Sequence, residues 1–80
     1  MLAFPNPFVI TDDDSRLNFN YAFEATITIF NVAGEQIIEM PLGPWDGKNS
    51  KGKEAASGVY LFLIRNEAGE TATGKFLLVR

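Results

Sequence analysis

Polar and apolar residues alternate with a period of two along most of this chain. Residues 16–21 alternate without a break, and residues 25–30 alternate up to Phe30. This is the pattern of a strand with one face buried and the other in water, and the β-branched residues of the second segment suit a pleated surface. No stretch has a sustained helical period of apolar residues. The pattern therefore predicts an all-β chain.

Turns separate the predicted strands. Ala33-Gly34 interrupts the alternation before it resumes over residues 35–40, which predicts a hairpin because glycine can take the positive φ of a tight turn. Residues 41–58 are rich in turn-forming Gly and Pro dipeptides. The remaining predicted elements are a strongly apolar strand over residues 59–65, a loop over residues 66–69 and a last strand over residues 70–80.

These elements predict one domain over residues 1–80. Six or seven short strands, with a turn about every eight to twelve residues, are typical of an immunoglobulin-like antiparallel β-sandwich with Greek-key connections. Pro5 and Pro7 restrict the start of the chain to an edge strand or an extended lead-in segment. The chain has no cysteine, so packing alone must hold the sandwich together.

The alternation also divides the side chains between the core and the surface. The predicted core consists of Leu17, Phe19, Ile27, Ile29, Ile37, Tyr60, Phe62, Ile64, Phe76 and Leu78. The same phase places Val59, Leu61, Leu63, Leu77 and Val79 on the outer face of two neighbouring strands. Such an apolar face is typical of an interface, unless a loop or the N-terminal segment covers it.

The composition excludes several classes of catalyst. With no histidine and no cysteine, the chain cannot build a Ser-His-Asp or Cys-His site, a thiol redox site or an ordinary zinc site. Two-carboxylate glycoside hydrolysis needs neither residue, but a domain of this size has little room for a deep cleft. We therefore expect a non-enzymatic protein with no cofactor and no metal.

Charge and hydropathy restrict the partners further. The net charge of −3 argues against a nucleic-acid partner. The longest fully apolar run, residues 59–64, is too short to span a bilayer. No basic segment and cleavage site follow Met1, so no secretory signal is visible. A start at the strand-like Leu2-Ala3-Phe4 indicates a fragment of a longer protein.

Three polar or aromatic segments each have two interpretations. Asp12-Asp13-Asp14 is either a solvated acidic turn or a source of Ca²⁺ ligands, and consecutive Asp side chains cannot all converge on one ion. Trp45 is either a plug at one end of the sandwich or a platform for stacking sugars. The lysines that follow it are either solvated turn charges or a site for an acidic or phosphate-bearing surface. These lysines are Lys48, Lys51 and Lys53.

Several strings of residues together resemble a known family. They are Phe4-Pro5-Asn6-Pro7-Phe8, Ile29-Phe30-Asn31-Val32-Ala33-Gly34-Glu35, Trp45-Asp46-Gly47-Lys48-Asn49, Ala56-Ser57-Gly58-Val59-Tyr60 and Gly74-Lys75-Phe76-Leu77-Leu78-Val79-Arg80. In this order and spacing they resemble the type A C-terminal sorting domain of proteins exported by the bacterial type IX, or Por, secretion system. They are equally similar to the related domain of flagellar hook-capping proteins, which shares the Trp-Asp-Gly and Ser-Gly-Val-Tyr elements.

The resemblance implies an Ig-like module at the C-terminus of a large secreted or cell-surface protein. In the sorting family this module is the export address of its cargo, recognised by secretion machinery at the outer membrane. The implied partners are that machinery and the N-terminal cargo domains of the same chain, and the implied location is the cell surface, reached through the periplasm. The alternatives are a structural assembly module of the hook-cap type and a carbohydrate-binding appendage.

The candidate partner-binding residues lie near the two ends of the chain. Pro5, Asn6 and Pro7 form either a receptor-read element or a rigid lead-in. In residues 74–80 the hypothesis is an address: a last strand with a free edge and outward-facing Leu77 and Val79, with Lys75 and Arg80 as orienting charges. The alternative is that this strand simply closes the sandwich.

Overall fold

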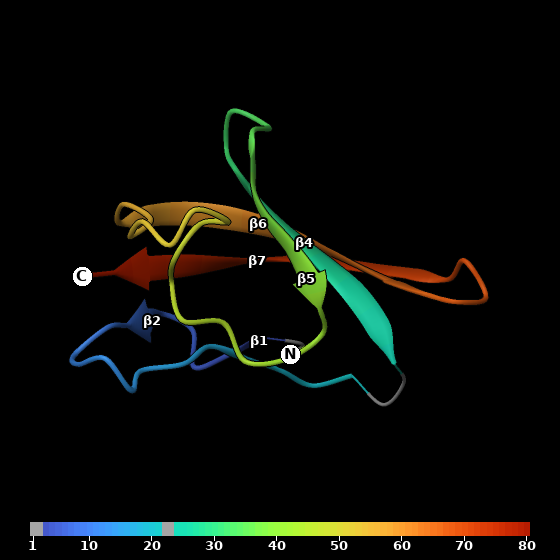
Figure 1. Cartoon of the computed structure of the whole chain (residues 1–80), viewed down its shortest axis with the longest axis horizontal. Helices are drawn as coiled ribbons and strands as arrows, with labels where there is room; N and C mark the ends of the chain where they lie inside the picture. Colours follow the sequence, from blue (N-terminus) through green and yellow to red (C-terminus); the bar gives the residue numbers. More distant parts are fainter. Residues whose placement is uncertain (1–2, 22–23) are drawn as a thin grey trace.

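The computed structural model of the chain describes residues 3–21 and 24–80 and contains seven strands. They are β1 (Ala3–Phe4), β2 (Phe8–Val9), β3 (Asn18–Phe19), β4 (Ala25–Asn31), β5 (Gln36–Pro41), β6 (Gly58–Asn66) and β7 (Thr71–Val79). Five of them form one sheet in the order β2-β7-β6-β4-β5 (Figure 1). The other two, β1 and β3, pair in a second, smaller sheet. The predicted all-β sandwich is confirmed.

The connection between β5 and β6 completes the second layer. It leaves the sheet edge at β5 and returns to β6 on the far side of β4, as in a Greek key. On the way, Trp45 and Leu17 exchange two backbone hydrogen bonds, each 2.9 Å long. The small sheet and this bridge cover the inner face of the large sheet, while the lead-in segment, residues 3–10, supplies β1 to the small sheet and β2 to the edge of the large one.

Two details differ from the predicted architecture. The strand expected over residues 16–21 is reduced to Asn18–Phe19, because Leu17 is bonded to the connection at Trp45 and not to a long neighbouring strand. The sheet is also not antiparallel throughout, since β2 pairs with β7 in parallel, with Phe8 opposite Leu78 and Val9 opposite Val79.

The two long hairpins end in identical turns. The sequence Asn-X-Ala-Gly-Glu closes β4–β5 at residues 31–35 and β6–β7 at residues 66–70. In each turn the Asn side-chain oxygen accepts a hydrogen bond from the Glu backbone N–H at 2.9 Å, and the Asn amide donates to the Glu carboxylate. The glycines have φ values of 84° and 82°. The predicted hairpin at Ala33-Gly34 is confirmed.

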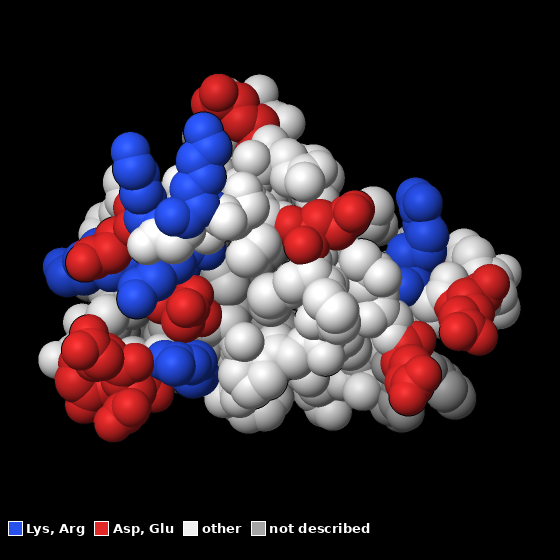
Figure 2. Space-filling view, in the orientation of Figure 1, with Lys and Arg blue, Asp and Glu red and all other residues white. Residues whose placement is uncertain are grey.

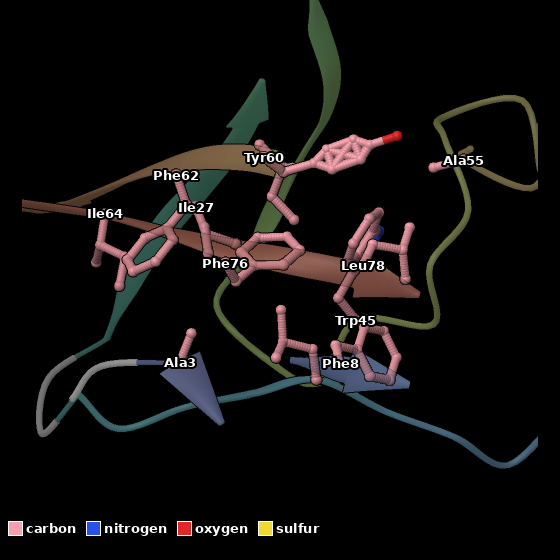
Figure 3. Packing of buried hydrophobic residues seen from close by; sticks show 12 residues of the cluster. Ala3, Phe8, Ile27, Trp45, Ala55, Tyr60, Phe62, Ile64, Phe76 and Leu78 are labelled. Atoms are coloured by element: carbon pink, nitrogen blue, oxygen red, sulfur yellow. The ribbon is translucent and has the colours of Figure 1, made fainter. Parts of the chain in front are cut away.

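The core is built around Trp45 and rings from the large sheet (Figure 3). The indole ring centroid lies 5.6 Å from that of Phe76, 6.1 Å from that of Tyr60 and 6.3 Å from that of Phe8. Among the described residues, the buried hydrophobic ones are Ala3, Phe8, Leu17, Ile27, Ile29, Trp45, Ala55, Tyr60, Phe62, Ile64, Phe76 and Leu78. Trp45 is thus a core plug, and the sugar-stacking interpretation is wrong because its ring is not accessible.

Phe19 and Ile37 were predicted in the core but are only half-buried. Phe19 belongs to the two-residue strand β3 and contacts Phe62 edge-on, at a centroid distance of 5.4 Å. Ile37 lies where the pairing of β4 with β5 shifts register, so that Ile37 and Ile38 share the inward position between them. The register shift explains why strict alternation misplaces Ile37.

Candidate recognition surface

The lead-in segment and the last strand, both predicted as partner-binding, lie side by side. The backbone N–H of Leu77 donates to Asn6 Oδ1 at 3.1 Å, and the N–H of Ile10 donates to the Val79 carbonyl at 2.8 Å. Between these two bonds, β2 pairs with the end of β7. Pro5 and Pro7, which flank Asn6, are exposed.

This arrangement corrects one expectation about the last strand. At Leu77–Val79 the edge of β7 is occupied by Asn6 and β2, so it does not offer free main-chain hydrogen bonds to a partner. The sequence predicted an edge strand or lead-in at Pro5–Pro7 but not that it would close this edge. What the end of β7 leaves accessible is its outer face.

The outer face is apolar, as the alternation predicts. Val9, Val59, Leu61 and Leu77 expose 46%, 43%, 41% and 41% of their surface, respectively. Leu77 lies directly opposite Val59, while Leu63 and Val79 are half-buried on the same face. The lead-in segment joins the sheet at its edge and adds Val9 to this surface instead of covering it. We call the four exposed side chains the apolar patch.

Lys75 lies on the outer face of the sheet, among the residues of the apolar patch. It is exposed, stands opposite Leu61 across the β6–β7 pair and is two residues from Leu77, on the same face. A residue beside exposed leucines on a rigid sheet is well placed to orient a partner by charge.

Arg80 has a different role from the one predicted. Its guanidinium donates to Glu54 Oε2 at 2.8 Å, to the Gly47 carbonyl at 2.6 Å and to the Ala55 carbonyl, while its backbone N–H donates to Ser57 Oγ at 2.9 Å. The side chain therefore fastens the β5–β6 connection to the end of β7. Its charge is used within the chain and is not a free orienting charge.

Tyr60 supports the same corner of the molecule from inside. Its hydroxyl donates a 2.5 Å hydrogen bond to the Ala56 carbonyl. Burial raises the pKa of this phenol above its ordinary value of 10.0, an effect that the nearby positive charge of Arg80 opposes. The phenol therefore remains a proton donor to Ala56 at neutral pH.

The acidic segment forms a turn. Asp12 Oδ1 accepts a hydrogen bond from the Asp14 backbone N–H at 2.9 Å, which is the pattern of an Asx turn. Across residues 3–21 and 24–80, no group of three or more acidic side chains is placed to hold a metal ion. Lys48, Lys51 and Lys53 are all exposed. Figure 2 shows basic side chains gathered at the end of the molecule where the β5–β6 connection lies, next to acidic ones.

The described part of the chain has no helix with the length and hydropathy needed to cross a membrane.

Comparison with known proteins shows the fold but no family. No family model matches the chain, and no curated protein matches it. Among solved structures the chain is similar to PorZ of Porphyromonas gingivalis, an essential bacterial surface component of the type-IX secretion system. The TM-score is 0.74 and the sequence identity 19%, over 98% of this chain and 11% of the PorZ chain. The fold of this chain thus occurs as a small part of a larger protein.

Proposed function

We propose that this chain is a non-enzymatic sorting and anchoring module that directs a larger cargo protein through the type IX secretion system to the cell surface. The observation that carries the proposal is the agreement of two independent signals. The sequence strings from Phe4 to Arg80 resemble the type A sorting domain, and the fold is similar to part of a surface component of the same secretion system.

The fold itself explains how so short a chain could act as an address. A single Trp-centred core orders the sheet, and the outer face of β6, β7 and β2 then presents apolar side chains at fixed positions. A contiguous exposed apolar patch of this kind normally marks an interface. The absence of histidine and cysteine from the sequence is consistent with a role in binding and not in catalysis.

The test is export of a reporter. A fluorescent protein that reaches the periplasm through its own signal peptide is fused to the N-terminus of this chain and expressed in a bacterium with a working type IX system. We expect the reporter on the cell surface or in the medium, and in the periplasm when the secretion system is deleted. Retention of the fusion in the periplasm of the competent host, as for the unfused reporter, would contradict the proposal.

The hook-cap alternative gives a different result in the same experiment. An assembly module would leave the reporter in the periplasm of both hosts. Its interface would instead be visible as self-association or as assembly with a neighbouring subunit.

A further inference from the structure

The charges on the outer face of β2, β6 and β7 are of one sign. The outward-facing residues of these strands are Val9 on β2, Val59, Leu61, Leu63 and Arg65 on β6, and Thr71, Thr73, Lys75, Leu77 and Val79 on β7. They include two cations, Lys75 and Arg65, and no carboxylate. The whole chain has an excess of acidic residues, ten against seven basic ones. On these three strands the outer face is therefore apolar and cationic, while Glu39 on β5 lies on the same side of the sheet near Arg65 and leaves Lys75 as the cation without an acidic neighbour on β6 or β7.

The same face contains a shallow hollow. It is lined mainly by apolar groups, with Leu61, Leu63 and Phe30 on the side of β6 and β4 and with Thr73 and Lys75 on the side of β7. Thr73, which has a short side chain, stands opposite Leu63. A hollow with this lining could admit an apolar side chain, and Lys75 would then lie beside it.

We propose that the outer face of β2, β6 and β7 is the surface by which this chain is recognised, and that its occupant is a protein surface with a protruding apolar side chain and a carboxylate opposite Lys75. The inference rests on the proposed function, for which it supplies the partner's chemistry. It also relocates the address from the edge of β7, whose end at Leu77–Val79 is occupied by Asn6 and β2, to the face of the sheet.

Charge favours such a partner over a second copy of this chain. Around a two-fold axis through Lys75, two copies would bring their Lys75 ammonium groups together, and no carboxylate lies beside Lys75 on β6 or β7 to pair with them. The apolar patch consists of four residues that each expose less than half of their surface, whereas a stable interface takes about 20–30 residues a side, so a weak, reversible contact is expected.

The hollow distinguishes a protein from a lipid surface. A bilayer presents no fixed protrusion that would use a hollow between Leu61, Leu63 and Lys75. A protein side chain does, and it would be held in register by the charge pair. The sheet also holds the hollow and Lys75 at a fixed distance from each other. A protein partner can match a fixed distance, whereas a fluid layer of lipid headgroups has no use for one.

The first experiment removes the apolar contact from the reporter fusion described above. Leu61→Thr with Leu77→Thr keeps the β propensity of both strands and alters only exposed positions. The matched control is Val32→Thr, which removes a side chain that is 72% exposed in the β4–β5 turn. Both variants should keep the melting temperature of the unaltered fusion. The amount of reporter on the cell surface should fall about tenfold or more for the double variant, as for the loss of a central interface contact. It should not fall for the control.

The second experiment tests the charge. Lys75→Glu places a carboxylate against the expected carboxylate of the partner, so export should fall by a similar factor. Lys75→Arg should export normally, and so should Lys51→Glu, which makes the same charge change in the exposed loop. Normal export of Lys75→Glu would overturn the assignment of a carboxylate to the partner.

The outcomes separate this inference from the proposed function. Periplasmic retention of the unaltered fusion overturns the proposed function and, with it, recognition of this face by the export machinery. Normal export of both the unaltered fusion and the folded Leu61→Thr, Leu77→Thr variant overturns only the present inference. Patch-dependent flotation with vesicles of phosphatidylethanolamine and phosphatidylglycerol would assign the face to a lipid surface instead. Patch-dependent dimers in sedimentation equilibrium would assign it to a second copy.

Discussion

At the scale of single residues, Phe62 and Gly74 fit closely against each other in the core. They lie opposite each other on β6 and β7, and the Phe62 ring fills the space where a side chain at position 74 would be. A Cβ atom at Gly74 would lie 2.5 Å from Phe62 Cζ. The ring also contacts Phe19 and Phe76, at centroid distances of 5.4 Å and 6.3 Å. Phe62 thus links both layers of the sandwich.

Truncation of Phe62 should therefore remove most of the stability of the domain. Phe62→Ala is expected to lower the free energy of unfolding by about 3–5 kcal/mol, because it leaves a cavity beside Gly74 that no side chain can fill. Small domains have a total stability of only about 5 kcal/mol or little more. Thermal and urea unfolding would measure the loss, with Phe4→Ala as the control because Phe4 is 47% exposed. A cooperative melt within a few degrees of the unaltered chain would show that Phe62 does not support the core in this way.

At the scale of elements, the β5–β6 connection is held by hydrogen bonds within it and by two side chains, Trp45 and Arg80, that join it to the rest of the fold. Trp45 anchors the start of the turn in the core and donates its indole N–H to the Lys48 carbonyl at 2.9 Å. Arg80 binds two carbonyls of the connection, those of Gly47 and Ala55, from the end of β7. Gly47 and Ala55 are also joined by a direct backbone hydrogen bond, so the guanidinium binds a pair of strand-like segments that already lie side by side.

Replacement of Arg80 should loosen this connection without unfolding the sheet. Arg80→Gln keeps the backbone bond to Ser57 but leaves the two carbonyls without the guanidinium, at an expected cost of about 1–2 kcal/mol. Arg80→Lys should restore little, because an ammonium lacks the planar fork that reaches both carbonyls. Hydrogen exchange would report faster exchange of the Ala55 amide, which donates to the Gly47 carbonyl at 2.9 Å.

The matched control for this prediction is Glu54→Gln. It breaks the ion pair with Arg80 but keeps the carbonyl bonds, and the Glu54 side chain is 68% exposed. Exposed ion pairs contribute little to stability, so this variant should exchange like the unaltered chain. Equal effects of Arg80→Gln and Glu54→Gln would mean that the ion pair, and not the carbonyl contacts, holds the connection.

At the scale of the whole molecule, features set by the local sequence pattern were predictable, and features set by contacts between distant residues were not. The phase of β4, β6 and β7 follows from alternation, so the buried Ile27 and Phe62 and the exposed Leu61 were placed correctly. The parallel pairing of β2 with β7 joins residues about 70 positions apart, and nothing in the local pattern of Phe8–Val9 specifies its partner strand.

The candidate site was predictable to a similar extent. Leu77 and Val79 were expected on the outer face because every second residue of a strand faces the same way. The bonding of the Arg80 side chain within the chain was not predictable, because its partners lie in a connection whose sequence has no regular period. The contribution of Val9 to the apolar patch was not predicted either. The face on which Val9 lies depends on the pairing of β2 with β7, which the sequence pattern does not specify.

The lead-in segment completes the fold at this scale, although it contributes only four strand residues. Phe8 is 1% exposed and packs its ring against Trp45, and Ala3 is buried in the same core. The segment also occupies the edge of β7 through β2 and Asn6. Its loss would open the core and free a sheet edge at the same time.

Deletion of residues 1–10 should therefore abolish cooperative folding. The remaining chain would lose the Phe8 contribution to the core and expose an unpaired edge of β7, so we expect a broad melt and concentration-dependent association in sedimentation velocity. A synthetic peptide of residues 3–11, added in excess, should restore the near-ultraviolet circular dichroism of Trp45 by taking the place of β2. The same peptide with Phe8→Ala should restore much less, since it can pair with β7 but cannot fill the core. A truncated chain that stays monomeric and melts like the full chain would show that the large sheet and the β5–β6 connection suffice without the lead-in segment.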